Sequence, residues 1–191
     1  GKGGPDFDNY YGITANPDDP NDPTPDILGD SFSENFDDGS MEGWRTIDAD
    51  GDFRNWNISQ GNGIEGIDES KCIYSESYDS QSNSPLTPDN YIVSDGLYTI
   101  TENSTLSFYA KPLDTWSNYY LEHYGVAISY DGTNFITVWE HTVSSTELDW
   151  VHKTVDLSDY AGRNVYIALR HFDCSNRYAI CIDNIELTSG N

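Results

Sequence analysis

Two acidic residues occupy positions where strand alternation would place an apolar side chain. Around Glu34, alternation puts Phe32 and Phe36 on the same face as the carboxylate, so Glu34 is expected to point toward the core. Near the C-terminus, Asp183 shares its face with three apolar side chains: Cys181, Ile185 and Leu187. A buried ionised carboxylate is costly unless a cation meets it. Both positions therefore predict a cationic partner.

A pairing of the first and last strands would bring these two carboxylates together. In many sandwiches those strands are neighbours, and then Glu34 and Asp183 need a metal ion or an arginine between them. The chain offers few cationic side chains, with 9 Lys and Arg against 33 Asp and Glu. A metal ion is the partner that this composition favours.

A third source of oxygen ligands is the run Asp48-Ala-Asp50-Gly-Asp52. Alternate aspartates around a glycine can turn several hard oxygen atoms toward one centre, which suits Ca²⁺. The run is not an EF-hand, because no helix flanks it. Together with the inward carboxylates it predicts structural calcium; the alternative is a solvated turn with salt bridges to Arg45 or Arg170.

Aromatic residues concentrate between positions 116 and 124. In a loop that leads into a strand, several of these rings must face solvent, where they could stack on sugars or seat a protein partner. The alternative is a loop that packs on the edge of the domain. The predicted ligand-binding residues are Trp116, Tyr119, Tyr120 and Tyr124.

No catalytic constellation is visible, and we predict that the chain is not an enzyme. The run from Gly61 to Gly66 matches G-x-G-x-x-G, but it lacks the strand before it and the helix after it that a dinucleotide site requires. His123 and His171 are expected to be ordinary hydrogen-bonded residues of a sandwich. A hydrolase stays open as a further alternative, because 33 acidic residues allow many carboxylate pairs.

The charge of the chain restricts its partners. A formal net charge of −24 would repel nucleic-acid phosphates and anionic membranes. No apolar run is long enough to insert directly into a membrane. The three cysteines show no zinc-site spacing, and their odd number leaves at least one unpaired; a bridge between Cys174 and Cys181 near a hairpin is an option.

The elements that must position these residues are short alternating strands. Inward positions such as Leu106, Phe108 and Ala110 alternate with polar neighbours, runs recur about every ten residues, and Asp131-Gly132-Thr133-Asn134 is a hairpin signal. We find no amphipathic helix of three turns. A chain of 191 residues with this pattern predicts one all-β domain, a jelly-roll β-sandwich.

The first 30 residues differ in composition from the rest. They hold five of the eight prolines, and proline restricts its neighbour and removes a backbone donor. We therefore assign residues 1–30 to an extended acidic linker rich in Pro, Asp and Gly, with Tyr10, Tyr11 and Ile13 as its contacts, and residues 31–191 to the domain.

The order of several strings resembles the cleaved adhesin domain family of gingipain-type haemagglutinins, also described as a choice-of-anchor module of Bacteroidetes surface proteins. The resemblance covers about residues 31–188 and rests on six segments in order: Phe32–Phe36, Gly43–Asp52 with Trp56, Thr87–Ser94, Glu122–Ser129, Arg170–Cys174 and Cys181–Ile185. Trp-x-x-Ile-Asp-Ala-Asp-Gly-Asp and Pro-Asp-Asn-Tyr-Ile are its most specific strings.

The resemblance implies a calcium-stabilised, non-catalytic module that is displayed on the cell surface or secreted. It places the metal ligands among Glu34, Asp48, Asp50 and Asp183, with Asp52 and Asp89 as further candidates. The expected partners are a host or matrix protein or a cell-surface glycan, bound by a monomer that is lipid-anchored through a missing N-terminal segment. The alternative is a carbohydrate-binding module that serves a polysaccharide-degrading system.

Overall fold

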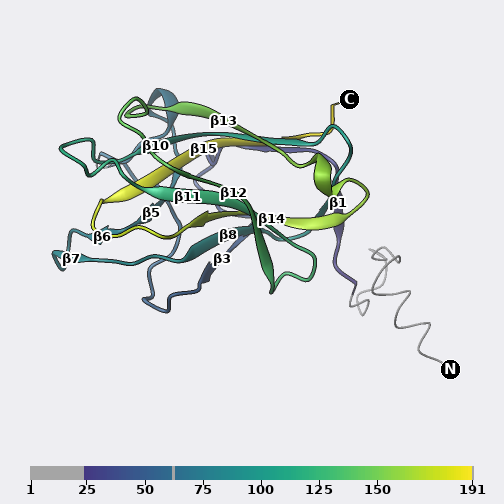
Figure 1. Cartoon of the computed structure of the whole chain (residues 1–191), viewed down its shortest axis with the longest axis horizontal. Coiled ribbons are helices and arrows are strands. Elements are labelled where there is room, and N and C mark those ends of the chain that lie inside the picture. Colours follow the sequence, from purple (N-terminus) through teal and green to yellow (C-terminus); the bar gives the residue numbers. More distant parts are fainter. Residues whose placement is uncertain (1–23, 62, 191) are drawn as a thin grey trace.

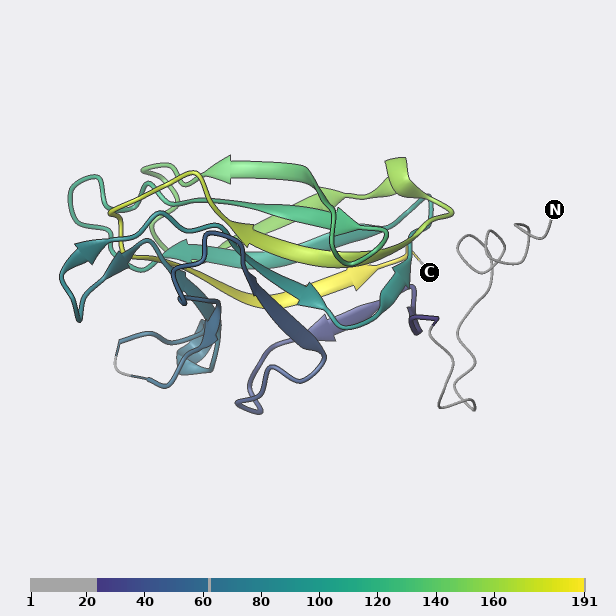
Figure 2. The same ribbon diagram turned by 90° about the horizontal axis from the view of Figure 1, so that it is seen from below.

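The computed structural model describes residues 24–61 and 63–190, which form two packed β-sheets (Figures 1 and 2). The first sheet contains β1 (Ile27–Gly29), β9 (Leu97–Thr99), β14 (Asn164–His171), β11 (His123–Ser129) and β12 (Phe135–Thr142), in that order. On β14 it continues with β8 (Asn90–Ser94), and β8 pairs with β3 (Trp44–Asp48).

The second sheet is built around the last strand. Its order is β13 (Val151–Asp156), β10 (Thr105–Pro112), β15 (Ala179–Thr188), β5 (Ile73–Glu76) and β4 (Asn57–Ile58), and β2 (Phe32–Glu34) also pairs with β15. A separate ribbon joins β6 (Tyr78–Asp79) and β7 (Ser84–Pro85), and two 3₁₀ turns cover Ile67–Glu69 and Ser158–Tyr160. The prediction of an all-β jelly-roll sandwich is confirmed.

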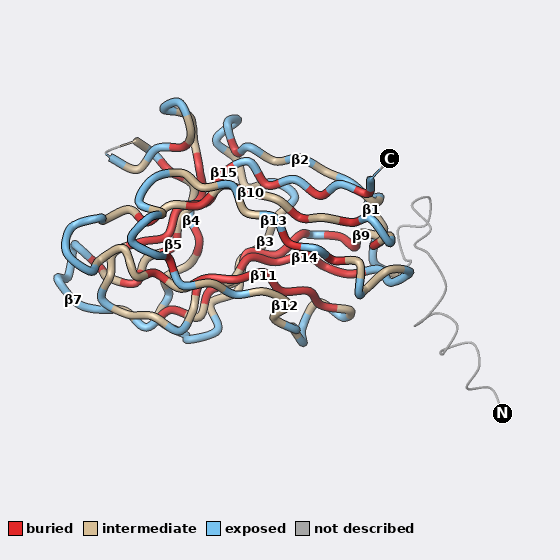
Figure 3. The backbone as a smooth tube through the Cα atoms, turned by 45° about the horizontal axis from the view of Figure 1, so that its top comes forward, coloured by how far each residue is buried: buried red, intermediate tan, exposed pale blue. Residues whose placement is uncertain are grey.

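Alternation within the strands creates the core. In β10, Leu106, Phe108 and Ala110 are buried and point between the sheets, while Tyr109 lies on the outer face. The first sheet contributes mainly β11 and β14, whose buried residues are coloured red in Figure 3. Aromatic edge contacts, such as that of Phe108 with Trp139 at 6.0 Å between ring centres, fill the space between the sheets.

The predicted hairpin between β11 and β12 is confirmed, and Asp131 fixes its turn. The carboxylate accepts the backbone N–H groups of Thr133 and Asn134, both at 2.8 Å. These bonds, led by those from Asn134, hold the pKa of Asp131 well below its usual range. Gly132 adopts the left-handed backbone that the turn requires (φ 81°).

A bulge in β15 overturns one prediction about its faces. Ile180 and Ile182 belong to the core, and so do Ile185 and Leu187, which changes the parity of the strand between them. Asn184 takes a positive φ of 50° at this point, and the register with β10 shifts there. Asp183 therefore lies on the outer side of the second sheet, away from Ile185 and Leu187.

The first sheet begins inside the segment that the sequence assigned to the linker. Strand β1, within the segment assigned to the linker, pairs in parallel with β9 and so belongs to the sheet. The contacts proposed for Tyr10, Tyr11 and Ile13 lie outside the described residues. Among the described residues, no helix has the length and apolar character to cross a membrane.

Candidate functional site

The three alternate aspartates converge on one side of the turn after β3. One carboxylate oxygen from each of Asp48, Asp50 and Asp52 lies within 4.8 Å of the others. Asp48 closes the turn, since its Oδ1 accepts the N–H of Gly51 at 3.0 Å and its Oδ2 accepts the N–H of Phe53 at 2.7 Å. The sequence prediction that these three residues gather their oxygens is confirmed.

The electrostatics of the cluster show a deficit of positive charge. Asp50 is exposed, but local desolvation of its carboxylate raises its pKa to about 6, and the neighbouring Asp48 and Asp52 add to the rise against a hydrogen bond from the Asp89 amide. One oxygen of Asp52, Oδ2, is buried without any hydrogen-bond partner. A buried carboxylate oxygen without a donor is a suitable ligand for a hard cation. The residues present thus fit Ca²⁺.

Asp89 does not add its carboxylate to this cluster. Its two oxygens accept hydrogen bonds from Nε and Nη2 of Arg170 at 2.8 and 3.1 Å, so this arginine pairs with Asp89 and not with the aspartates of the turn. Its backbone N–H instead binds Asp50. Arg45 pairs with no carboxylate there, because it donates to the carbonyl of Gly132 at 2.7 Å.

Glu34 and Asp183 are not brought together. The strands do pair as predicted, with Glu34 opposite Ile185, but each carboxylate has protein donors of its own. Glu34 accepts the indole N–H of Trp44 at 3.1 Å and the backbone N–H of Phe36 at 3.0 Å. The prediction that Glu34 and Asp183 share a metal ion or an arginine is wrong, because the bulge in β15 turns Asp183 away.

Asp183 is fully buried beneath the segment from Gly66 to Lys71. Its Oδ2 accepts the N–H of Ile67 at 3.0 Å and faces the hydroxyl of Ser70 at 3.4 Å. Burial raises the pKa of Asp183, while these hydrogen bonds oppose the rise. Gly66 approaches so closely that an added Cβ would lie 2.6 Å from that same oxygen. The carboxylate is an anchor for this loop.

The aromatic segment divides into an exposed part and a buried part. Trp116 is 75% exposed and stacks on Tyr119 at 6.0 Å between ring centres. Tyr120 is partly buried against the core, and Tyr124 is 1% exposed inside it. The prediction that Tyr124 binds a ligand is wrong, because β11 turns its ring toward Phe108 and Trp139.

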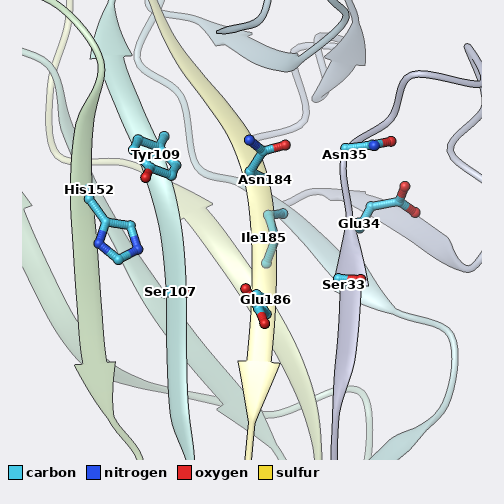
Figure 4. Close-up of a pocket in the computed structure, with 9 residues that line it drawn as sticks. All are labelled: Ser33, Glu34, Asn35, Ser107, Tyr109, His152, Asn184, Ile185 and Glu186. Atoms are coloured by element: carbon cyan, nitrogen blue, oxygen red, sulfur yellow. The ribbon is translucent and has the colours of Figure 1, made fainter.

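A groove that the sequence reasoning missed crosses the outer face of the second sheet (Figure 4). Its volume is about 400 Å³, and in its wall Tyr109 and His152 lie side by side on β10 and β13, with ring centres 4.7 Å apart. The other lining residues come from β2 and the residue that follows it, from β10 and from β15, and they are mostly polar: Ser33, Glu34, Asn35, Ser107, Asn184, Ile185 and Glu186. The only signal in the sequence is the outward position of Tyr109 between inward core residues.

A buried polar cluster also escaped the sequence analysis. Glu122 and His171 are both fully buried, and Glu122 Oε1 lies 2.8 Å from His171 Nε2. The thiol of Cys174 lies 3.4 Å from each of those two atoms. His171 is hydrogen-bonded as expected, but the thiol was not anticipated there. Cys174 and Cys181 form no bridge, and all three cysteines are free.

Comparisons with known proteins agree on one family. The family model of the Cleaved Adhesin Domain matches residues 30–187. Lys-gingipain W83 of Porphyromonas gingivalis is 34% identical over 175 residues, which cover 83% of this chain and 10% of that protein. Hemagglutinin A of P. gingivalis W83 is 33% identical over 181 residues, 82% of this chain and 8% of that protein. The chain therefore spans about a tenth of the length of these curated relatives.

Solved structures give the same result for the fold. The K1 cleaved adhesin domain of Lys-gingipain from P. gingivalis W83 superposes with a TM-score of 0.73 at 33% identity, covering 84% of this chain and 99% of that one. A CBM61 module in complex with β-1,4-galactotriose reaches a TM-score of 0.54 at 11% identity, over 81% of this chain and 94% of that one. At that identity the likeness concerns the sandwich alone.

Proposed function

The chain belongs to the Cleaved Adhesin Domain family, and from this membership we propose that it is a calcium-stabilised, non-catalytic adhesion module of a secreted or surface-displayed bacterial protein. The observation that carries the calcium part is the convergence of Asp48, Asp50 and Asp52, with one buried oxygen of Asp52 left without a donor. The ligand part rests on the groove beside Tyr109 and on the exposed ring of Trp116.

Calcium would act on the fold through the loop after β3. Asp48, Asp50 and Asp52 would hold the ion, whose positive charge would offset both the desolvation and the nearby carboxylates that raise the pKa of Asp50. The backbone of Asp89 ties this loop to the start of β8, since Ala49 donates to its carbonyl and its own N–H donates to Asp50. Ion binding would therefore stabilise the junction of β3 and β8 as well as the loop.

Removal of calcium tests this part of the proposal. EGTA should lower the melting temperature of the full chain, and Ca²⁺ should restore it where Mg²⁺ does not, because Mg²⁺ requires a smaller octahedral shell. Asp52→Asn should abolish most of the calcium-dependent shift. Asp149→Asn changes the same charge on an exposed loop and is the matched control. A melting curve that responds identically in both variants would overturn the assignment.

The groove suits a neutral glycan. The neighbouring rings of Tyr109 and His152 offer a platform on which a sugar ring can stack, and Ser107, Asn184 and Asn35 supply donors and acceptors for its hydroxyls. An acidic glycan would meet Glu186 and a chain of net charge −24. A carbohydrate-binding module is accordingly the second candidate function, and the sandwich of the galactotriose-binding CBM61 module is compatible with it.

Paired substitutions separate the two kinds of ligand. We expect that the chain binds neutral oligosaccharides on a glycan array, and that Tyr109→Ala weakens this binding by about 1–3 kcal/mol, as loss of an aromatic anchor does. Trp116→Ala, on a different surface, should leave glycan binding unchanged and weaken binding to a panel of host or matrix proteins. If neither variant alters binding to any ligand of the array or the panel, both surfaces are ruled out.

A further inference from the structure

The cluster of Glu122, His171 and Cys174 lies where the two sheets meet. Glu122 comes directly before β11, His171 is the last residue of β14, and Cys174 follows it in the loop toward β15. The pairing of Tyr124 with His171 brings the first two together across neighbouring strands. The opposite sheet contributes Ser75 of β5, whose Oγ lies 2.7 Å from Nδ1 of His171.

Surrounding hydrogen bonds leave each of the three residues one atom that points to a shared centre. Ser75, itself bonded by the amide of Asn90 at 3.1 Å, engages Nδ1 of His171 and leaves Nε2 facing inward. Ser77 donates to Oε2 of Glu122 at 3.0 Å and leaves Oε1 facing inward. Outer partners that orient a histidine and a carboxylate in this way are typical of metal sites.

The distances between the three inward atoms match one face of a tetrahedron. Ligand atoms that lie about 2.0–2.3 Å from Zn²⁺ are separated from one another by about 3.3–3.6 Å. Here Cys174 Sγ lies 3.4 Å from both Glu122 Oε1 and His171 Nε2. The third edge, between Oε1 and Nε2, is 2.8 Å and must open by about 0.5 Å to reach that range.

We propose that Glu122, His171 and Cys174 form a zinc site at the junction of the two sheets. One nitrogen, one sulfur and one carboxylate oxygen are a donor set that selects Zn²⁺ over Ca²⁺, which takes oxygen ligands. On binding, a Zn–Sγ bond replaces the S–H bond of Cys174, and the metal also displaces the proton shared between His171 Nε2 and Glu122 Oε1. Both protons pass to solvent, and the neutral imidazole then carries its one proton on Nδ1, toward Ser75. Cys174 is the one partly exposed member, so a water molecule completes the shell from its side.

The site is separate from the calcium proposal and can be tested in the presence of excess Ca²⁺. The full chain is freed of transition metals with phenanthroline and titrated with Co²⁺, which reports tetrahedral geometry in the visible region and thiolate ligation in the near ultraviolet. We expect both the visible bands and the near-ultraviolet thiolate band to grow until one Co²⁺ is bound per chain. Addition of Zn²⁺ should abolish both, because Zn²⁺ displaces Co²⁺. Zn²⁺ should also raise the melting temperature of the wild-type chain.

Variants assign the spectrum to these residues. Cys174→Ser should remove the thiolate band and the thermal shift with Zn²⁺, and Ser75→Ala should weaken Zn²⁺ binding about ten- to a hundredfold through loss of the group that orients His171. His123→Gln, at the neighbouring histidine that bonds Thr142, should leave both signals intact. The absence of a thiolate band in the wild-type chain, or its persistence in Cys174→Ser, would overturn the proposal.

Discussion

At the scale of single residues, Asp183 shows how a carboxylate predicted to bind metal can serve a loop. Asp183→Ala removes the acceptor of the Ile67 N–H and leaves that partly buried group without its partner. We expect the free energy of unfolding to fall by about 1–3 kcal/mol, measured by urea denaturation. The shift in melting temperature on addition of EGTA should equal that of the wild-type chain. A smaller EGTA-induced shift in Asp183→Ala than in the wild-type chain would show that Asp183 is a calcium ligand after all.

Glu147 provides a test of pH dependence. Although partial burial opposes the effect, the Lys153 ammonium and His141 lower the pKa of Glu147 to about 2 from an ordinary value of 4.5. A carboxylate whose pKa is depressed in the folded state stabilises the fold above its unfolded pKa, and this contribution disappears as the pH falls toward the folded value. Glu147→Gln should therefore cost about 1 kcal/mol at pH 7.

The loss in free energy of unfolding caused by Glu147→Gln should shrink as the pH falls from about 4.5 to about 2. Over this interval Glu147 becomes protonated, so that the wild-type side chain is then neutral like the glutamine of the variant. Urea denaturation of the wild-type and variant chains at several pH values measures the difference. Asp149→Asn, in the same connection between β12 and β13, is the control for the general effect of acid. A difference that does not change over this interval would contradict the ion-pair assignment.

At the scale of elements, the segment before β5 depends on a glycine for steric reasons. A Cβ on Gly66 would lie 2.3 Å from the carbonyl oxygen of Lys71, so backbone atoms must move to accommodate it. Gly66→Ala should destabilise the fold by about 1–3 kcal/mol in urea denaturation, as overpacking does. Its effect should not add fully to that of Asp183→Ala, because both changes release the same loop. Full additivity would show that the two residues act separately.

At the scale of the whole molecule, net charge sets the response to salt. With a net charge of −24, the excess carboxylates repel one another in the folded chain and destabilise it. Salt screens this repulsion. In EGTA, the melting temperature should rise as NaCl increases. Ca²⁺ should raise it further when the ionic strength is held constant. If Ca²⁺ and NaCl of equal ionic strength have equal effects, screening alone accounts for the stabilisation and the aspartate site does not bind the ion.

The sequence alone determined what depends on local periodicity. Inward Phe108 and outward Tyr109 follow from the period of two in a strand, and the turn at Asp131 follows from its own side chain. Asp48, Asp50 and Asp52 could be predicted as a cluster because residues only two apart in one turn must be near each other.

Only the tertiary structure decided the contacts between distant strands. The bulge at Asn184 places Asp183 on the outer side of the sheet, opposite to the side predicted from strand alternation. Nothing in the residue types of β15 predicts this bulge. Glu122 and His171, 49 positions apart, meet because β11 pairs with β14 in one particular register. Register is set by the packing of the whole sandwich. The spacing of residues along the sequence therefore does not show which residues of different strands will meet in a cluster.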